Sequence, residues 1–196
     1  MGTQEMDYLA LMSAALIPDD IVTLALAGVI SMRSHRKPPY HVPIAGLEGR
    51  ELRALLDRYF PGAAVLDLVA DEPAMAERTD EFSDLLALLV EYRTVGNRES
   101  RWLAHAIATA SMAENHLWQD MGLPDRAALS RLMSQYFMPL ASRNVNNMRW
   151  KKFFYRQLCE RSGLSICRSP SCAVCTDYRN CFGPEEPVAK VLLSVA

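Results

Sequence analysis

Four cysteines near the C-terminal end of the chain have the spacing of metal ligands. Cys167, Cys172, Cys175 and Cys181 form a C-x4-C-x2-C-x5-C array, and Cys159 stands eight residues before it. The start of the chain lacks a basic, secretory n-region, so we expect a cytoplasmic, reducing location. In such a compartment clustered cysteines bind metals more often than they form disulfides. The array therefore predicts a metal centre.

The spacing favours an iron–sulfur cluster over zinc. Structural zinc sites usually combine two cysteine pairs, often C-x2-C, across a longer segment, whereas this array contains a single C-x2-C. The C-x4-C-x2-C part is the spacing that holds three of the four cluster ligands in plant-type ferredoxins, although their fourth ligand is distant. From spacing alone, zinc and the absence of any metal remain open alternatives.

The array lies in a basic part of the chain. Residues 143–181 include eight basic and two acidic residues, while the whole chain carries a formal net charge of −2. That overall balance favours neither a nucleic-acid nor a membrane partner. Five of the basic residues are candidates for an oxyanion entry or for binding an acidic protein partner, and solvation of the outer faces of a helix explains them equally well: Arg149, Lys151, Lys152, Arg156 and Arg161.

The segments that must position the array have a helical pattern. Apolar residues repeat at intervals of three and four, and Pro and Gly interrupt them. Residues 63–71 fit either a helical turn or a short strand, and strand signals elsewhere are too few for a sheet. We predict an all-α helical bundle with a C-terminal cysteine-rich metal-binding loop, and helices over residues 8–17, 20–32, 51–60, 80–93, 99–112, 126–137 and 148–162.

The last predicted helix leads directly into the array. Asn146 or Asn147 is expected to cap it, and Gly163 is expected to end it. Four apolar side chains share one face: Trp150, Phe153, Phe154 and Leu158. Of these we expect Trp150, Phe153 and Phe154 to pack in the core.

We expect one domain over residues 1–196. It divides into an N-terminal helical part (1–80), a helical core (81–162) and the cysteine-rich loop (163–186). The longest apolar run, residues 21–30, is well short of the roughly 18–20 residues that cross a bilayer.

Several sequence blocks, in addition to the cysteines, resemble the NifQ family of nitrogen-fixation proteins. They are R-W-K-K-F-F-Y-R-Q-L-C from Arg149, S-P-S-C ending at Cys172, C-F-G-P-E-E from Cys181 and H-L-W-Q-D-M-G-L from His116. The resemblance is good over residues 85–186 and weak over the first 80.

The resemblance implies a carrier of molybdenum and not an enzyme with turnover. Members of the family are understood to bind an iron–sulfur cluster through these four cysteines and to associate with molybdenum derived from molybdate. They pass it to the machinery that builds the nitrogenase iron–molybdenum cofactor, the NifEN scaffold acting with the NifH iron protein. The resemblance thus assigns Cys167, Cys172, Cys175 and Cys181 as the cluster ligands.

Three residues outside the array are candidate molybdenum ligands. His116 comes first and Asp120 second, since residues four apart share one helix face and supply nitrogen and oxygen ligands. Cys159 is the third, as a spare thiolate. Each also has a structural explanation: a histidine bound to backbone, a solvated acid and a small half-buried helix residue. His105, among apolar residues, is expected to be a satisfied core histidine.

Two other functions use the same cysteines. The first is a ferredoxin-like electron-transfer protein, which would be reduced reversibly and hold no molybdenum. The second is a zinc-stabilised protein-interaction module, which would contain zinc and no iron.

Overall fold

The computed structural model describes residues 2–32, 39, 42–47, 49–63, 79–163, 175 and 178–185. Within these ranges every regular element is a helix, in agreement with the predicted all-α fold. The helices are α1 (Thr3–Ala14), α2 (Ile21–Ser31), α3 (Gly49–Tyr59), α4 (Asp80–Glu91), α5 (Arg98–Ser111), α6 (Leu117–Asp120), α7 (Arg126–Tyr136), α8 (Met138–Ala141), α9 (Trp150–Arg161) and α10 (Tyr178–Phe182).

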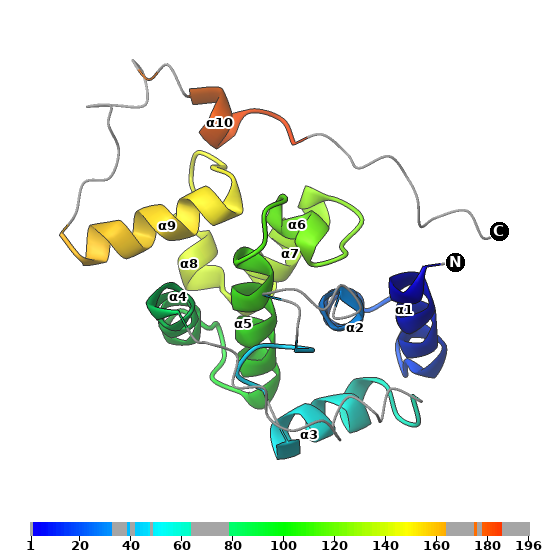
Figure 1. The fold of residues 1–196 in the computed structure, drawn as a ribbon. Helices are drawn as coiled ribbons and strands as arrows, with labels where there is room; N and C mark the ends of the chain where they lie inside the picture. Colours follow the sequence, from blue (N-terminus) through cyan, green and yellow to red (C-terminus); the bar gives the residue numbers. More distant parts are fainter. Residues whose placement is uncertain are drawn as a thin grey trace.

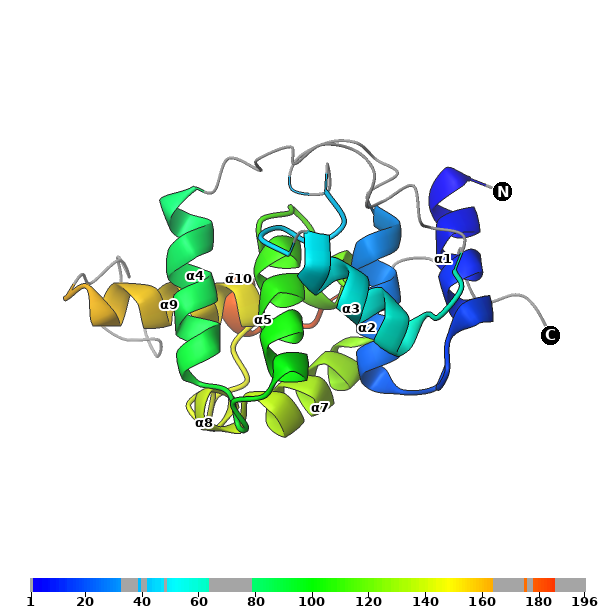
Figure 2. The same ribbon diagram turned by 90° about the horizontal axis from the view of Figure 1, so that it is seen from below.

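Helix α5 lies at the centre of the bundle. Figure 1 shows α4 on one side of it and α2 on the other, with α1 outside α2. Seen from below, α3 crosses in front of this row and α9 lies crosswise (Figure 2). From Trp102 to Ser111 every side chain of α5 is buried, and most are small or apolar. A helix that is apolar all round needs neighbours on every side, which explains its central position.

Side chains before four of the helices cap them as their residue types predict. Each accepts hydrogen bonds from backbone N–H groups of the first turn, which have no partner within the helix. The capping residues are Asp20 for α2, Thr79 for α4, Asn97 for α5 and Asp125 for α7.

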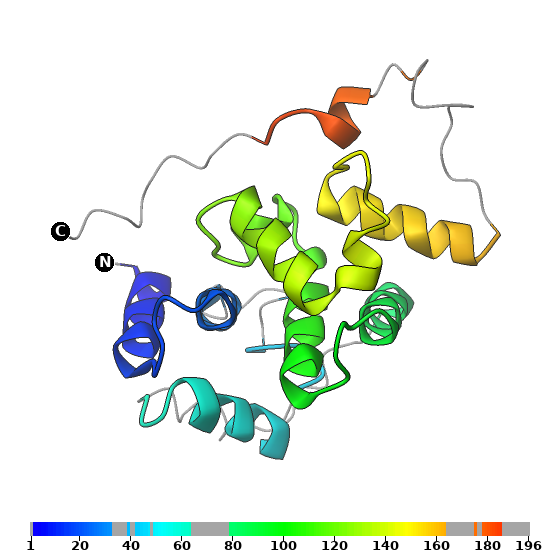
Figure 3. The same ribbon diagram turned by 180° about the vertical axis from the view of Figure 1, so that it is seen from behind.

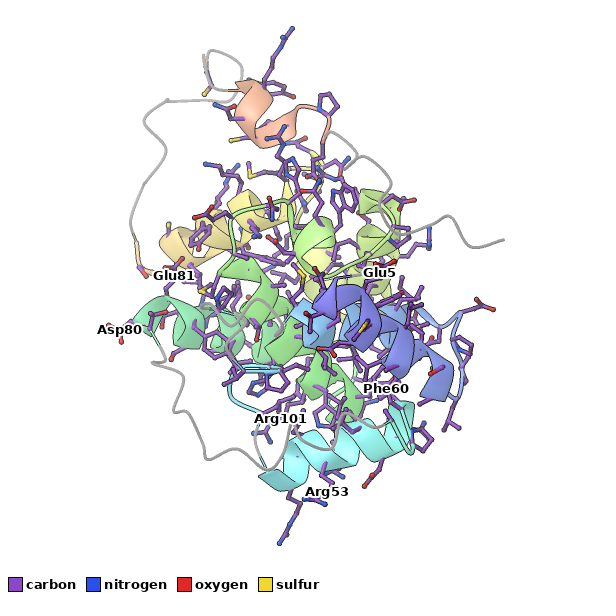
Figure 4. All side chains as sticks on the ribbon, turned by 45° about the vertical axis from the view of Figure 1, so that its right-hand side comes forward. Glu5, Arg53, Phe60, Asp80, Glu81 and Arg101 are labelled. Atoms are coloured by element: carbon purple, nitrogen blue, oxygen red, sulfur yellow. The ribbon has the colours of Figure 1, made fainter. Side chains whose placement is uncertain are left out.

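Helix α9 confirms the predicted aromatic-bearing helix before the array. Trp150, Phe153 and Phe154 are buried and their rings contact one another, with Gln157 completing the buried stripe one turn later. Along its outer side α9 binds α4: Tyr155 donates a hydrogen bond to Glu81, and Arg161 pairs with Glu91 at 2.6 Å. Figure 4 labels Glu81 between the two helices.

The predicted cap of α9 was wrong. The residue before α9 is Arg149, which has no side-chain capping bond. Asn147 instead takes a left-handed conformation (φ 53°), and its carbonyl and side-chain oxygens accept from Arg126. Gly163 does end α9 as expected, with φ 66°.

Helix α1 runs from Thr3 to Ala14 and not over the predicted residues 8–17, since Ala15 is already extended. The remaining differences from the prediction concern short elements. Helices α6, α8 and α10 are only 4, 4 and 5 residues long, too short for an apolar period to reveal. Helix α10 falls in the segment predicted as loop. Most of residues 163–186, and residues 64–71 of the ambiguous segment, lie outside the described residues. No helix in the described part of the chain is long and apolar enough to cross a membrane.

Two glycines bring the backbones of α2 and the turn after α6 into contact. A Cβ on Gly122 would lie 2.8 Å from the Cα of Gly28, and a Cβ on Gly28 would overlap the carbonyl of Met121. Gly122 also has φ 64°, a conformation that suits glycine. This contact joins α2 to the segment that carries the residues around His116.

We expect Gly122→Ala to destabilise the fold by about 3 kcal/mol, as the sum of a left-handed alanine and overpacking against α2. Gly62→Ala is the matched control, because Gly62 has φ 73° but no neighbour within 4 Å. The control should lose only about 1–2 kcal/mol. Urea unfolding followed by circular dichroism measures both; equal losses would contradict the close contact.

Candidate metal centre

Three of the five cysteines lie within the described residues, and all three are free thiols. Cys159 is on α9, Cys181 is on α10 and Cys175 stands just before α10, where its carbonyl accepts from Tyr178 N at 3.3 Å. Each is partly buried. Cys167 and Cys172 lie outside the described residues. Reduced, partly covered thiols are what a thiolate-bound cluster requires, so Cys175 and Cys181 fit that use.

The first residues of α9 hold the end of the array. The backbone N–H of Arg149 donates to the carbonyl of Cys181 at 2.8 Å. The Arg149 guanidinium donates to the carbonyls of Gly183 (3.4 Å) and Pro184 (3.0 Å). The backbone of Cys181 is therefore held beside the N-terminus of α9.

Helix α9 thus joins both ends of the cysteine-rich segment. The segment leaves the C-terminal end of α9 at Gly163 and returns to its N-terminal end at Cys181. With 12 residues, α9 is about 18 Å long. Figures 1 and 3 show α10 at the outer edge of the molecule, next to the start of α9. A rigid helix consequently sets the distance between the two ends.

The residues after Cys181 are also held against the helical body. Glu185 accepts from Arg126 Nη1 at 2.6 Å, and its side chain is 5% exposed. His116 Nδ1 lies 3.9 Å from the other Glu185 oxygen. We call residues 181–185 the anchor segment, because Arg149 and Arg126 bind its two ends.

Asp120 and Lys151 form a buried ion pair between α6 and the first turn of α9. Lys151 Nζ donates to Asp120 Oδ2 and to the carbonyl of Ala113, both at 2.6 Å, and Asn115 donates to Asp120 Oδ1 at 3.0 Å. The Asp120 side chain is 1% exposed, so it is not the solvated acid considered above. Burial lowers the pKa of Lys151, and the Asp120 carboxylate opposes that effect. The pair ties α9 to the α5–α6 segment.

The other basic residues of α9 differ in how they are used. Arg156 pairs with Glu160 at 2.8 Å, one turn later on the same helix, and Arg161 pairs with Glu91. Lys152 is exposed, and no described residue pairs with it. Of the five candidates for an oxyanion entry or a partner surface, Lys152 is the one whose charge no described carboxylate or carbonyl engages. That function of the five residues stays a prediction.

The candidate molybdenum ligands are not brought together around one point. His116 faces Glu185, Asp120 is bound by Lys151 and Asn115, and Cys159 lies farther along α9. Over the described residues, three or more His, Cys, Asp or Glu side chains nowhere converge as metal ligands. His105 is buried with Nδ1 2.9 Å from the Ala45 carbonyl, which confirms the expected core histidine.

Comparison with known proteins identifies the family. A model of the NifQ family matches residues 25–183, a range that contains the whole cysteine array. The chain belongs to the NifQ family. It is 40% identical to protein NifQ of Azotobacter vinelandii over 158 aligned residues. The aligned region covers 75% of this chain and 80% of that protein. With protein NifQ of Rhodobacter capsulatus the identity is 42% over 140 residues, or 71% and 76% of the two chains. No solved structure matches the chain.

Membership in the NifQ family confirms the resemblance inferred from the sequence blocks. The family match begins at residue 25, farther toward the N-terminus than the resemblance over residues 85–186 indicated. Protein NifQ of Klebsiella pneumoniae is 56% identical over 81 residues. The sequence analysis did not predict that Arg126 binds Glu185 of the anchor segment. Neither residue belongs to a helical apolar repeat or to a set of residues with metal-ligand spacing. The C-F-G-P-E-E block, which contains Glu185, was the available signal.

Proposed function

We propose that this NifQ-family chain is an iron–sulfur molybdenum carrier that supplies molybdenum for synthesis of the nitrogenase iron–molybdenum cofactor. One observation carries the proposal: the C-x4-C-x2-C-x5-C array lies inside the region that matches the family. Its spacing favours an iron–sulfur cluster over zinc. The chain acts as a carrier and not as an enzyme.

The proposed ligands are Cys167, Cys172, Cys175 and Cys181. When bound, an iron–sulfur cluster would provide the sulfur-rich setting in which molybdenum is carried. The chain's own contribution is to position the thiolates. Arg149 holds the carbonyls of Cys181, Gly183 and Pro184, and Arg126 holds Glu185. These bonds fix the C-terminal end of the array before any metal binds.

The cargo and the partners complete the proposal. Molybdenum would enter from molybdate and be passed to the cofactor-assembly proteins, the NifEN scaffold with the NifH iron protein. The basic surface of α9, where Lys152 is exposed, is the proposed approach for an oxyanion or an acidic partner. If molybdate loading is insensitive to ionic strength and to Lys152→Gln, that approach is wrong.

Elemental analysis after anaerobic purification tests the function. The protein should contain iron and acid-labile sulfide together, and also molybdenum when the cells receive molybdate, with a paramagnetic resonance signal on reduction. One zinc per chain with no iron would instead indicate an interaction module. Iron and sulfide with reversible reduction but no molybdenum would indicate electron transfer. Either result would overturn the carrier function.

A further inference from the structure

We propose a second, separate site: a binding site for a small divalent oxyanion in the basic cavity between α3, α4 and α5. The cavity has a volume of about 620 Å³ and is lined by the first turn of α3, the end of α4, and α5. Its described lining residues include no cysteine and no residue of α9, so the proposed site is separate from the proposed metal centre. Its size is within the range of about 300–1,000 Å³ that is usual for small-ligand sites.

The charge of the cavity is strongly positive. Three guanidinium groups line it, from Arg93 after α4 and from Arg98 and Arg101 on α5, and Glu51 is the only carboxylate among the described lining residues. Arg98 and Arg101 are three residues apart and so share one face of α5. The excess of cations around this half-open hollow, where the Arg98 and Arg101 side chains reach solvent, attracts anions.

Two of these guanidinium groups are held in place by the protein. Arg98 donates to both oxygens of Glu51, at 3.2 and 3.1 Å, and its guanidinium lies 5.1 Å from the centre of the Trp102 ring. Arg93 donates to the carbonyls of Val90 (2.8 Å) and Asn97 (3.3 Å). Each arginine has five N–H groups, so N–H groups remain on both for a ligand. Holding the donors before binding lowers the entropy cost of capturing an anion.

Arg101 is the residue best placed to bind the anion. It is exposed, lies one turn after Arg98, and makes no hydrogen bond to any described residue. Its charge also contributes to lowering the pKa of Glu51, after the hydrogen bonds from Arg98 and Trp102 and the charge of Arg98. Figure 4 labels Arg101 where α5 faces α3. His105 also lines the cavity, but its Nδ1 is already bonded to the Ala45 carbonyl.

The ligand class follows from the donors. A guanidinium presents parallel N–H groups that match the paired oxygens of an oxyanion and stays charged at every ordinary pH. Sulfate, phosphate and molybdate share this tetrahedral chemistry. The arginines alone do not discriminate among them, so we expect sulfate and molybdate to bind with similar affinity.

Isothermal titration of the full chain with sodium sulfate, and separately with sodium molybdate, at constant ionic strength tests the site. Arg101→Gln should weaken sulfate binding about tenfold, as expected for losing charge-assisted hydrogen bonds. Arg53→Gln is the matched control, since Arg53 lies on the exposed outer side of α3 (Figure 4) and should leave binding unchanged. Because Arg101 makes no hydrogen bond within the described fold, its variant should remain folded, which circular dichroism checks.

Three results would overturn the proposal: no sulfate binding, unchanged binding in Arg101→Gln, or equal weakening in Arg53→Gln. Cys181→Ser separates this site from the metal centre, because that variant should bind sulfate as the unaltered chain does. Sulfate binding that disappears in Cys181→Ser would place the anion at the cysteines instead and would also overturn the proposal. Failure of the carrier function alone would leave the sulfate result unchanged.

Discussion

Replacing Cys181 by serine should reduce the iron and sulfide content of anaerobically purified protein about tenfold or more. A serine hydroxyl does not ionise near neutral pH, whereas cluster ligands are thiolates. The effect should be large because the backbone of Cys181 is held by the body of the protein, through Arg149 N. Iron and acid-labile sulfide per chain measure the result.

Cys159→Ser is the matched control for that experiment. Cys159 is also a partly buried free thiol, but it lies on α9 and outside the array. Its replacement should leave iron and sulfide at the level of the unaltered protein. If both variants lose the cluster equally, Cys159 is a ligand, and if neither does, the array does not hold the cluster through Cys181.

Replacing Asp120 by alanine should destabilise the protein by about 3–5 kcal/mol. The change leaves the Lys151 ammonium partly buried without its carboxylate, and such an uncompensated charge is costly. It also removes the acceptor of Asn115. Because the total stability of a domain is about 5–15 kcal/mol, a loss of this size should be visible as a large shift of the urea midpoint.

An exposed ion pair on α9 provides the control for Asp120→Ala. Glu160 pairs with Arg156, both side chains are 52% exposed, and Glu160 also accepts from Gln157 Nε2 at 2.8 Å, so Glu160→Ala should cost only about 1 kcal/mol. A loss below about 1 kcal/mol for Asp120→Ala would contradict the structural importance of the buried pair.

A further variant, Asp120→Asn, separates two roles of Asp120. If the role of Asp120 is purely structural, the Asp120→Asn protein should retain its full molybdenum content per folded chain, because asparagine keeps hydrogen-bonding groups near Lys151. A molybdenum ligand predicts a lower molybdenum content in the folded Asp120→Asn protein. The ion pair favours the structural role, since ligation would require Lys151 to give up its partner.

The local elements of this protein follow from short stretches of its sequence. Periodic apolar residues, such as those of α9, and capping residues such as Asp20 act within a few neighbours, so helix positions were predictable. The wrong prediction for the cap of α9 shows the limit of such local patterns. Asn147 has the right residue type and position, but its oxygens bind Arg126, from a different helix, and Cys181 supplies the acceptor for the N–H of Arg149.

The cysteine array was also determined by the sequence alone, because ligand type and spacing are local properties. The partners of charged side chains were not. Lys151 and Asp120 are 31 residues apart, and Arg126 and Glu185 are 59 apart. No sequence period connects such residues; they meet because α9 and the anchor segment pack against α6 and α7. Only the tertiary structure therefore decided that Asp120 is a buried ion-pair partner, and that α9 holds the beginning and the end of the cysteine-rich segment.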